Sequence, residues 1–182
     1  NHPYRPAIIF RMAEAYLSYA EALNESSERM SHKQEILDNL NKIRHRAGIA
    51  EYGTGTDENG FTRIKINFSD QKEVRRLIHK ERRVEFVGEG VRYHDLRRWK
   101  TAHYGIGNLN EQGENPDWGV NGPDYGMNYY GTEYTDQGDN AFFKRTKYMD
   151  RVYPRKFYWY PIHQSEIDKD PTLVQGPFWL GE

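Results

Sequence analysis

The sequence predicts a mainly α-helical protein with little β structure. Three stretches, residues 7–24, 31–48 and 70–87, carry apolar residues at the spacing of an amphipathic helix. Between residues 102 and 151, frequent glycines interrupt every run that is long enough to form a helix. We therefore expect one helical domain over residues 1–182, with a variable aromatic loop insertion at residues 102–151.

The composition excludes several classes of protein. The chain has 26 basic and 27 acidic residues in interspersed order, so it lacks the positive surface that binds nucleic acids or anionic membranes. Its longest apolar runs are only a few residues long, too short for a membrane-spanning helix. Cysteine is absent, which excludes a disulfide framework. Because the chain begins with Asn1 and helix signals follow almost at once, we expect a fragment of a longer protein.

The first predicted helix covers residues 7–24. Its apolar residues recur at helical spacing and are Ile8, Ile9, Met12, Tyr16, Tyr19, Ala20 and Leu23. Glu14 and Glu21 fall on the opposite side of this helix. The small side chains of Ala13 and Ala20 permit a second helix to approach closely.

The second predicted helix begins at Ser31, where Ser31 and Gln34 have the spacing of a capping box, and ends at Gly48. Only residues 25–30 separate it from the first helix. Helices joined so closely pack antiparallel, as in tetratricopeptide-like superhelices. No second copy follows at a fixed period, so the sequence predicts one helical hairpin and does not demonstrate a repeat array.

Residues 51–68 are rich in glycine and predict a loop or a small β-hairpin. Within them, Asp57, Glu58 and Asn59 superficially suggest calcium ligands. Their spacing does not match an EF-hand, so we expect no metal site there. The chain also lacks a phosphate-binding glycine loop and a metalloprotease motif, and we therefore predict no cofactor.

The third predicted helix, residues 70–87 with Ser69 as its cap, carries charge on its apolar face. The apolar stripe consists of Val74, Leu77, Ile78 and Val84, with Glu81 and Glu85 at its centre. Burying an unpaired carboxylate costs several kcal/mol, so cations must lie beside these two residues. The charges therefore predict a buried ion network.

A second short helix after Gly88 supplies the expected cation. Its apolar side consists of Tyr93, Leu96 and Trp99, and Arg92 projects from that same side. We predict that Arg92 pairs with Glu81 or Glu85. Arg82 and Arg83 are the alternative partners, but they point to the flank and to the opposite face of their own helix.

The cluster of Glu81, Glu85 and Arg92 has a catalytic rival interpretation, because paired carboxylates also mark glycoside hydrolases. Adjacent arginines would keep both carboxylates ionised. Glycoside cleavage needs one of the two to be protonated near neutral pH. The sequence therefore favours a structural network and a protein that is not an enzyme.

The excursion at residues 102–151 is too rich in aromatic residues to be a disordered segment, so we expect an ordered loop. A sugar ring presents an apolar face and a fringe of hydroxyl groups, which an aromatic platform beside polar side chains can bind. The candidate carbohydrate-binding residues of this kind are Trp118, Tyr125, Tyr129, Tyr130, Asn121 and Asp124. Alternatively, these rings only pack the loop onto the body of the protein.

The C-terminal tail returns to a compact pattern. Residues 157–160 predict a short strand or an extended buried run. Ser165 is expected to cap a single helical turn through Asp168, which Pro171 ends.

Three blocks of the sequence together carry a family resemblance. They are RMAEAYLSYAEALNE with LNKIRHRAGI, HKERRVEFVGEGVRYHDLRRWK, and YPIHQSEIDKDPTLVQGP. In order and approximate spacing they resemble the C-terminal region of the SusD/RagB family of outer-membrane nutrient-binding lipoproteins. The resemblance covers residues 8–177 and implies a SusD-like α-superhelix.

The resemblance also implies a function. Family members bind glycans at the bacterial cell surface without catalysis, for import through a SusC-type TonB-dependent transporter, and a lipid anchor outside this chain would hold the protein to the outer membrane. The expected partners are therefore that transporter and an oligosaccharide. A helical-repeat scaffold that binds only protein is the alternative.

Overall fold

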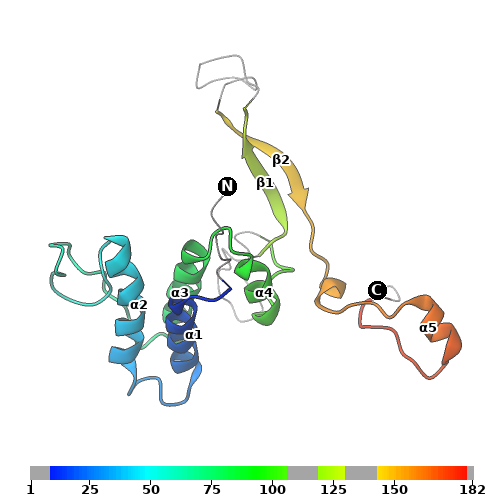
Figure 1. Cartoon of the computed structure of the whole chain (residues 1–182), viewed down its shortest axis with the longest axis horizontal. Helices are drawn as coiled ribbons and strands as arrows, with labels where there is room; N and C mark the ends of the chain where they lie inside the picture. Colours follow the sequence, from blue (N-terminus) through cyan, green and yellow to red (C-terminus); the bar gives the residue numbers. More distant parts are fainter. Residues whose placement is uncertain (1–8, 106–118, 130–142, 180–182) are drawn as a thin grey trace, which may run out of the picture. The chain divides into compact units, whose positions relative to one another are not determined.

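The computed structural model describes residues 9–105, 119–129 and 143–179. The chain forms two compact units, Asn1–Arg92 and Tyr93–Glu182. The described residues contain five α-helices, one short 3-10 helix and one two-stranded sheet (Figure 1). This content confirms the predicted mainly α class with little β structure.

Helix α1, Met12–Glu25, starts five residues later than expected. Ala13, Leu17 and Ala20 are buried in its core-facing side. The predicted apolar face was wrong at Ile9, Met12 and Tyr19, which are 96%, 57% and 48% exposed. It was also wrong at Glu21, which we placed on the outer side and which is buried. Helix α1 packs against two other helices, α2 and α3. Its buried face therefore differs from the one that the apolar spacing predicted.

Helix α2, Lys33–Ala47, follows with His32 at its N-cap, and no side chain caps that end. The capping box expected at Ser31 was therefore wrong. The predicted end at Gly48 is confirmed: its φ of 66° lies in the left-handed region. The N–H of Gly48 donates to the carbonyl of His45, and the N–H of Ile49 donates to that of Arg44. This pattern is a Schellman motif.

Helix α3, Gln71–Glu85, is capped by Asp70, whose carboxylate accepts the N–H groups of Lys72 and Glu73. Our assignment of Ser69 as the cap was wrong. So was the placement of Val84 in the apolar stripe, since its side chain is 64% exposed. Arg82, expected on the flank, is buried and donates to the hydroxyl of Ser18 on α1.

The core of the first unit lies where α1, α2 and α3 meet (Figure 1). Its fully buried aliphatic side chains are Leu17, Ala20, Ile36, Leu40, Val74 and Ile78. Burying side chains of this size stabilises a fold by about 1.5–3 kcal/mol each. The three helices therefore form a rigid base for the loop that joins α2 to α3.

That loop, residues 49–70, is anchored by Asp57. The buried Asp57 carboxylate accepts the backbone N–H groups of Glu51, Asn59 and Phe61 at 3.1, 3.0 and 2.8 Å. Burial raises the pKa of Asp57, but these three hydrogen bonds and the charge of Arg63 outweigh burial, so the pKa lies below its ordinary value. The acidic residue that superficially suggested a calcium ligand thus holds the turn of a loop.

The second unit contains most of α4, Val91–Arg98, followed by strands β1, Gly122–Met127, and β2, Arg145–Arg151. The strands pair antiparallel, with Gly122 opposite Arg151 and Met127 opposite Arg145, and a bulge follows Asp124. The described part of the predicted loop excursion is therefore built on a β-hairpin. Its side chains are mostly exposed, so glycine within the strands costs no core packing.

The tail contains the 3-10 helix η1, Arg155–Tyr158, and helix α5, Gln164–Lys169. We expected a short strand or an extended buried run at residues 157–160, and both alternatives were wrong, because the 3-10 helix includes residues 157 and 158 and none of the four residues is buried. The cap of α5 is His163, whose side chain accepts the N–H of Ser165 at 3.3 Å, and Ser165 itself is not the cap. Across the described ranges, every helix is too short or too polar to cross a membrane.

Candidate functional site

The charged face of α3 is matched by arginines from other helices. The buried carboxylate of Glu81 accepts hydrogen bonds from Arg44 of α2 at 2.6 Å and from the hydroxyl of Tyr52 at 2.7 Å. The guanidinium of Arg44 also lies over the ring of Tyr52, 4.4 Å from its centroid. Burial and the negative charge of Glu81 both raise the pKa of Tyr52, which keeps its hydroxyl protonated as a donor.

Glu85 lies one turn further along α3 and pairs with two arginines, Arg11 and Arg46. Burial raises the pKa of Glu85, but hydrogen bonds and positive charge from the two arginines outweigh it, so the pKa lies below its ordinary value. Arg11 also donates two hydrogen bonds, of 2.9 and 2.7 Å, to the carboxylate of Glu89. Arg44, Arg11 and Arg46 are thus partners that we did not expect, and the pairing of Arg92 with either carboxylate stays a prediction.

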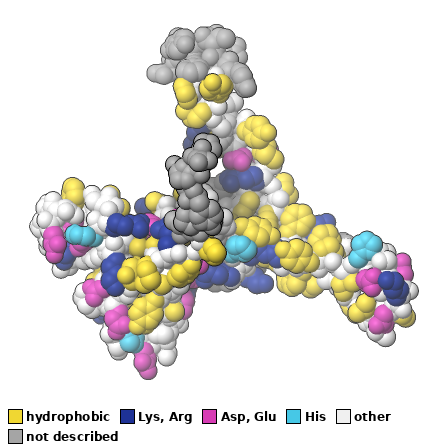
Figure 2. Space-filling model, viewed as in Figure 1, with side chains coloured by type: hydrophobic (Ala, Val, Ile, Leu, Met, Phe, Trp, Pro, Cys, Tyr) yellow, Lys and Arg dark blue, Asp and Glu magenta, His cyan; other side chains and the backbone are white. Residues whose placement is uncertain are grey.

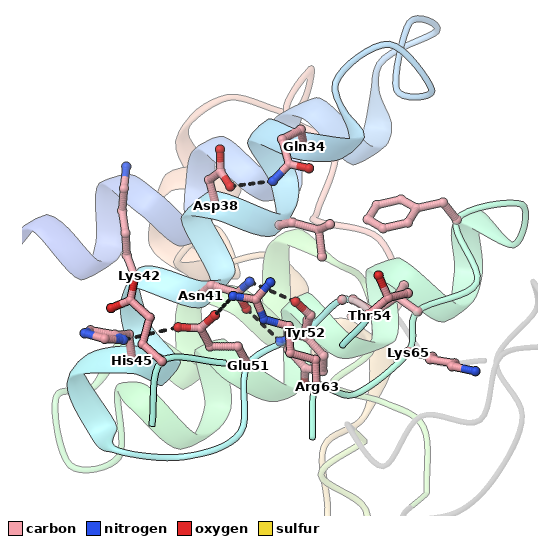
Figure 3. A pocket seen from close by; sticks show the side chains of 15 residues that line it. Gln34, Asp38, Asn41, Lys42, His45, Glu51, Tyr52, Thr54, Arg63 and Lys65 are labelled. Carbon is pink, nitrogen blue, oxygen red and sulfur yellow. Dashed lines mark hydrogen bonds and ion pairs between the residues drawn. The ribbon is translucent and has the colours of Figure 1, made fainter. Parts of the chain in front are cut away.

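A groove of about 700 Å³ runs along α2, opposite the loop that follows it (Figure 3). Its polar side chains bind one another. The amide of Asn41 exchanges hydrogen bonds with the backbone of Tyr52 at 2.9 and 2.8 Å. Glu51 lies between Arg63 at 2.8 Å and His45 at 3.2 Å. These contacts fasten the loop to α2 and use several of the polar groups that line the groove.

The β-hairpin carries two of the candidate carbohydrate-binding aromatics. Tyr129 is 69% exposed and Tyr125 is 46% exposed. The guanidinium of Arg145 lies 4.0 Å from the centroid of the Tyr125 ring and covers one of its faces. Each ring therefore presents aromatic surface to solvent, which a platform for a sugar requires.

The other four candidate carbohydrate-binding residues are Asn121, Asp124, Trp118 and Tyr130. The side-chain amide of Asn121 donates to the carbonyl of His103 at 2.6 Å and accepts the N–H of Tyr153, so the fold already uses it. Asp124 lies 3.8 Å from Arg151 across the hairpin. Trp118 and Tyr130 lie outside the described residues. The structure thus separates Asn121, which fastens the hairpin to residues 103 and 153, from the exposed Tyr125 and Tyr129.

A second, smaller pocket of about 180 Å³ lies within the second unit. Five of its eight lining residues are aromatic; the lining consists of Trp99, Lys100, His103, Tyr104, Arg155, Tyr158, Trp159 and Phe178. In the space-filling view, hydrophobic side chains gather over the segment that contains η1 (Figure 2). Trp159 and Phe178 are 37% and 41% exposed. This pocket combines aromatic walls with an opening to solvent.

Hydrogen bonds to the backbone hold the walls of this aromatic pocket. Arg97 of α4 donates to the carbonyls of Phe157 and Tyr158 at 2.7 and 2.8 Å, which fixes the end of η1 against α4. The hydroxyl of Tyr158 lies 2.9 Å from Nδ1 of His103 and accepts the backbone N–H of the same residue. Burial raises the pKa of Tyr158, so the hydroxyl stays neutral.

Lys100 is one of the two basic residues that line this pocket, with Arg155 as the other. Its ammonium group lies 5.1 Å from the centroid of the Tyr158 ring and 4.9 Å from that of the Trp159 ring. Lys100 also lies just after the C-terminal end of α4, with φ at 60°. Its N–H donates to Arg97 and the N–H of Thr101 donates to Leu96, the same Schellman motif that Gly48 forms after α2.

The residues of the aromatic pocket were absent from our sequence-based candidates. We had assigned Trp99 to the apolar side of a helix and residues 157–160 to a short strand or an extended buried run. The available signal was the density of aromatic and basic residues in RRWK and RKFYWY. Periodicity describes one helix or strand at a time, so it could not predict this pocket. The pocket is formed by a helix end, a 3-10 helix and the C-terminal segment, which are spread over some eighty residues of chain.

Comparisons with known proteins agree on one family. The sequence model described as the SusD family matches residues 3–179. SusD-like protein P38 of Formosa agariphila is 32% identical over 103 residues, which are 57% of this chain and 19% of that protein. SusD-like protein P25 of the same organism is 33% identical over 92 residues, covering 50% of this chain and 15% of that protein.

Solved structures give the same result. The crystal structure of a SusD-like protein from Bacteroides fragilis superposes with a TM-score of 0.60 at 27% sequence identity. The superposition covers 98% of this chain and 28% of that chain. The matched part of this chain therefore covers less than a third of the length of each of these relatives.

Proposed function

The chain belongs to the SusD family, and from this premise we propose that it is part of a glycan-binding protein of the bacterial cell surface. The bound oligosaccharide would pass to a SusC-type TonB-dependent transporter for import across the outer membrane. A lipid anchor outside this chain would hold the protein to that membrane. The role requires a surface that binds sugars and releases them unchanged.

The observation that carries this proposal is the exposed aromatic surface of the second unit. Sugar rings stack on aromatic faces through their C–H groups, and rings that are partly exposed and firmly held suit this contact. The aromatic pocket offers Trp159 and Phe178, and the hairpin adds Tyr125 and Tyr129. Two separate places for sugar rings support the binding of an oligosaccharide chain.

A role without catalysis is supported by the state of the two carboxylates on α3. Glu81 and Glu85 are each held by arginine, and the lowered pKa of Glu85 keeps it ionised at neutral pH. A glycosidase needs one carboxylic acid that is still protonated near neutral pH. We therefore assign the pair to the fold and propose no hydrolytic step.

Affinity isolation tests the proposed partner. The intact protein would be isolated from detergent-solubilised outer membranes, and the proteins that accompany it identified by mass spectrometry. A TonB-dependent transporter in stoichiometric amount is the expected result. Calorimetry with a panel of oligosaccharides tests glycan binding. An assay for new reducing ends in the same mixtures tests the absence of hydrolysis. Absence of both a transporter and any saccharide affinity would contradict the proposal, and release of reducing ends would contradict its non-catalytic part.

One observation favours the second candidate, a scaffold that binds only protein. Large apolar side chains are exposed at the start of the first unit, with Ile9 96%, Phe10 60% and Met12 57% exposed. Such a patch is typical of a surface that another protein segment covers. Isolation of a stable protein complex that contains no transporter, from a protein that binds no saccharide, would select this candidate.

A further inference from the structure

We propose that the aromatic pocket selects a sugar residue that carries a negative charge, such as a uronate or a sulfate ester. This inference rests on the proposed function and names the class of glycan. Both kinds of substituent are anionic at neutral pH, and both present several acceptor oxygens on a ring that is otherwise neutral. The pocket matches that chemistry in its charge, in its rings and in the position of Lys100.

The charge of the lining is the first argument. The described lining contains the cations Lys100 and Arg155 and no carboxylate. The groove along α2 provides the contrast, because its lining mixes Lys42 and Arg63 with Asp38 and Glu51. A pocket with one sign of charge and low-dielectric aromatic walls concentrates the opposite charge. An anionic ligand is therefore favoured over a neutral one.

The position of Lys100 is the second argument. Its ammonium rests over the faces of Tyr158 and Trp159, and among the residues that the structure describes no carboxylate lies within ion-pair distance of it. An ammonium has three N–H donors and no acceptor, and ring faces hold it without using those donors in conventional hydrogen bonds. The pocket thus holds a cation in place with donors available for an anionic oxygen.

The backbone at this position is the third argument. Lys100 occupies the left-handed position that Gly48 occupies after α2, where glycine is the residue without strain. Phe178 also has a positive φ, 66°, and lines the same pocket. Two of the three described non-glycine residues with positive φ therefore meet here. Strained backbone of this kind gathers at binding sites, where the side chain is needed despite its cost.

The test compares acidic and neutral oligosaccharides on the intact protein by calorimetry. The probes are an oligogalacturonate, which carries uronates, a carrageenan oligosaccharide, which carries sulfate esters, and a neutral malto-oligosaccharide of the same length. We expect at least one acidic probe to bind more tightly than the neutral one. Its affinity should fall as salt rises from 0.05 to about 0.5 M, because the pocket is partly exposed and its charges are screened.

Three substitutions make the test specific. Lys100→Gly removes the ammonium at a position where glycine adopts the backbone without strain, so the variant folds, and it should lose about fivefold in affinity for the acidic probe. Lys100→Arg keeps the charge and should keep most of that affinity. Lys169→Ala is the matched control, because it removes an exposed ammonium of the same unit that pairs with Glu166 at 2.8 Å. This control should leave binding unchanged.

The outcomes separate this inference from the function on which it rests. Preference for the uronate probe, or for the sulfated one, supports the inference and identifies the substituent, provided that Lys100→Gly abolishes the preference. Equal binding of acidic and neutral probes, or a preference that survives Lys100→Gly, overturns the inference and leaves the glycan-binding role standing. A folded protein that binds none of a broad saccharide panel overturns both.

Discussion

The carboxylate of Glu81 on α3 lies 2.6 Å from the guanidinium of Arg44 on α2, and both side chains are buried. An ion pair in this position contributes to stability only while it is complete, because either partner alone is a charge without compensation in a poorly solvated site. The hydroxyl of Tyr52 completes the hydrogen bonding of the carboxylate. This three-residue contact ties α2, α3 and the intervening loop together.

Replacement of Glu81 by glutamine should therefore damage folding. The variant keeps the shape of the side chain but leaves Arg44 without a counter-charge, and we expect the free energy of unfolding to fall by about 3 kcal/mol. Urea denaturation followed by circular dichroism measures this change. Lys80→Gln, at an exposed position of the same helix, is the control and should change stability by less than about 0.5 kcal/mol. A Glu81→Gln variant as stable as that control would refute the structural role.

Replacement of Gly119 by alanine should disturb the attachment of the hairpin. A Cβ atom at this position would lie 2.0 Å from the backbone carbonyl oxygen of Tyr104, and backbone cannot move aside as a flexible side chain can. We expect a loss of about 2 kcal/mol in the free energy of unfolding. Gly126→Ala within β1 is the matched control, since a Cβ there meets nothing within 4 Å. Equal thermal stability of the two variants would show that the close approach is unimportant.

The loop anchored by Asp57 should respond to acid. The pKa of Asp57 is lower in the folded protein than in the unfolded chain, where it is about 3.9. The stabilisation by this carboxylate is therefore complete above pH 5 and is lost as the pH falls through the folded pKa. We expect the amide protons of Asn59 and Phe61, which it accepts, to exchange faster as the pH falls below 4, relative to the intrinsic rate. Asp57→Asn should abolish this pH dependence, and a wild-type profile in that variant would contradict the assignment.

Lys100→Gly should raise stability while it weakens binding. Glycine adopts the left-handed conformation at no steric cost, so we expect a gain of about 1 kcal/mol in the free energy of unfolding. Thermal unfolding of the two proteins without ligand measures the gain. Lys100→Ala retains a Cβ at the same φ and should show no such gain, which makes it the control for backbone strain. A fall in stability with Lys100→Gly would mean that the stacking on Tyr158 and Trp159 outweighs the strain.

Our prediction for the loop residue Trp118 stays open. Trp118→Ala in the intact protein is expected to weaken glycan binding, and Tyr129→Ala should do the same if the hairpin forms a platform, each by about fivefold or more. Trp159→Ala tests the aromatic pocket in the same way. Calorimetry of the three variants with one oligosaccharide ranks their losses of affinity. Tyr148→Ala, which removes another highly exposed ring of the hairpin, is the comparison. Unchanged affinity in both Trp118→Ala and Tyr129→Ala would exclude the hairpin as a platform.

The helices were predictable because their signals are local. The end of α2 at Gly48 depends on one residue and its nearest neighbours, and the structure confirms it. The caps were harder to predict. His32, Asp70 and His163 occupy these positions where we expected Ser31, Ser69 and Ser165, since adjacent polar residues offer similar hydrogen bonds and packing decides between them.

The partners of Glu81 and Glu85 were only half predictable. Two carboxylates in an apolar stripe required cations, and cations are there, but Arg44 and Arg11 lie 37 and 74 residues away in the sequence. Arg92 was the natural choice from sequence alone, because helical spacing placed it on the apolar side of the next helix. For the same reason the aromatic pocket was missed: its walls come from segments that only the folded chain brings together, and the strained φ of Lys100 leaves no trace in the residue type.

The contacts of Arg11 have a further consequence, for the order in which the first unit folds. The link from Arg11 to Glu89 closes a loop of 78 residues, whereas α1 and α2 are joined by a short turn. Contacts between neighbours in sequence form early in folding, because little chain entropy is lost in closing a short loop. We therefore expect the helical hairpin of α1 and α2 to assemble first and α3 to dock onto it. The contacts of Arg11 with Glu85 and Glu89, which join the two ends of the unit, are expected to form last.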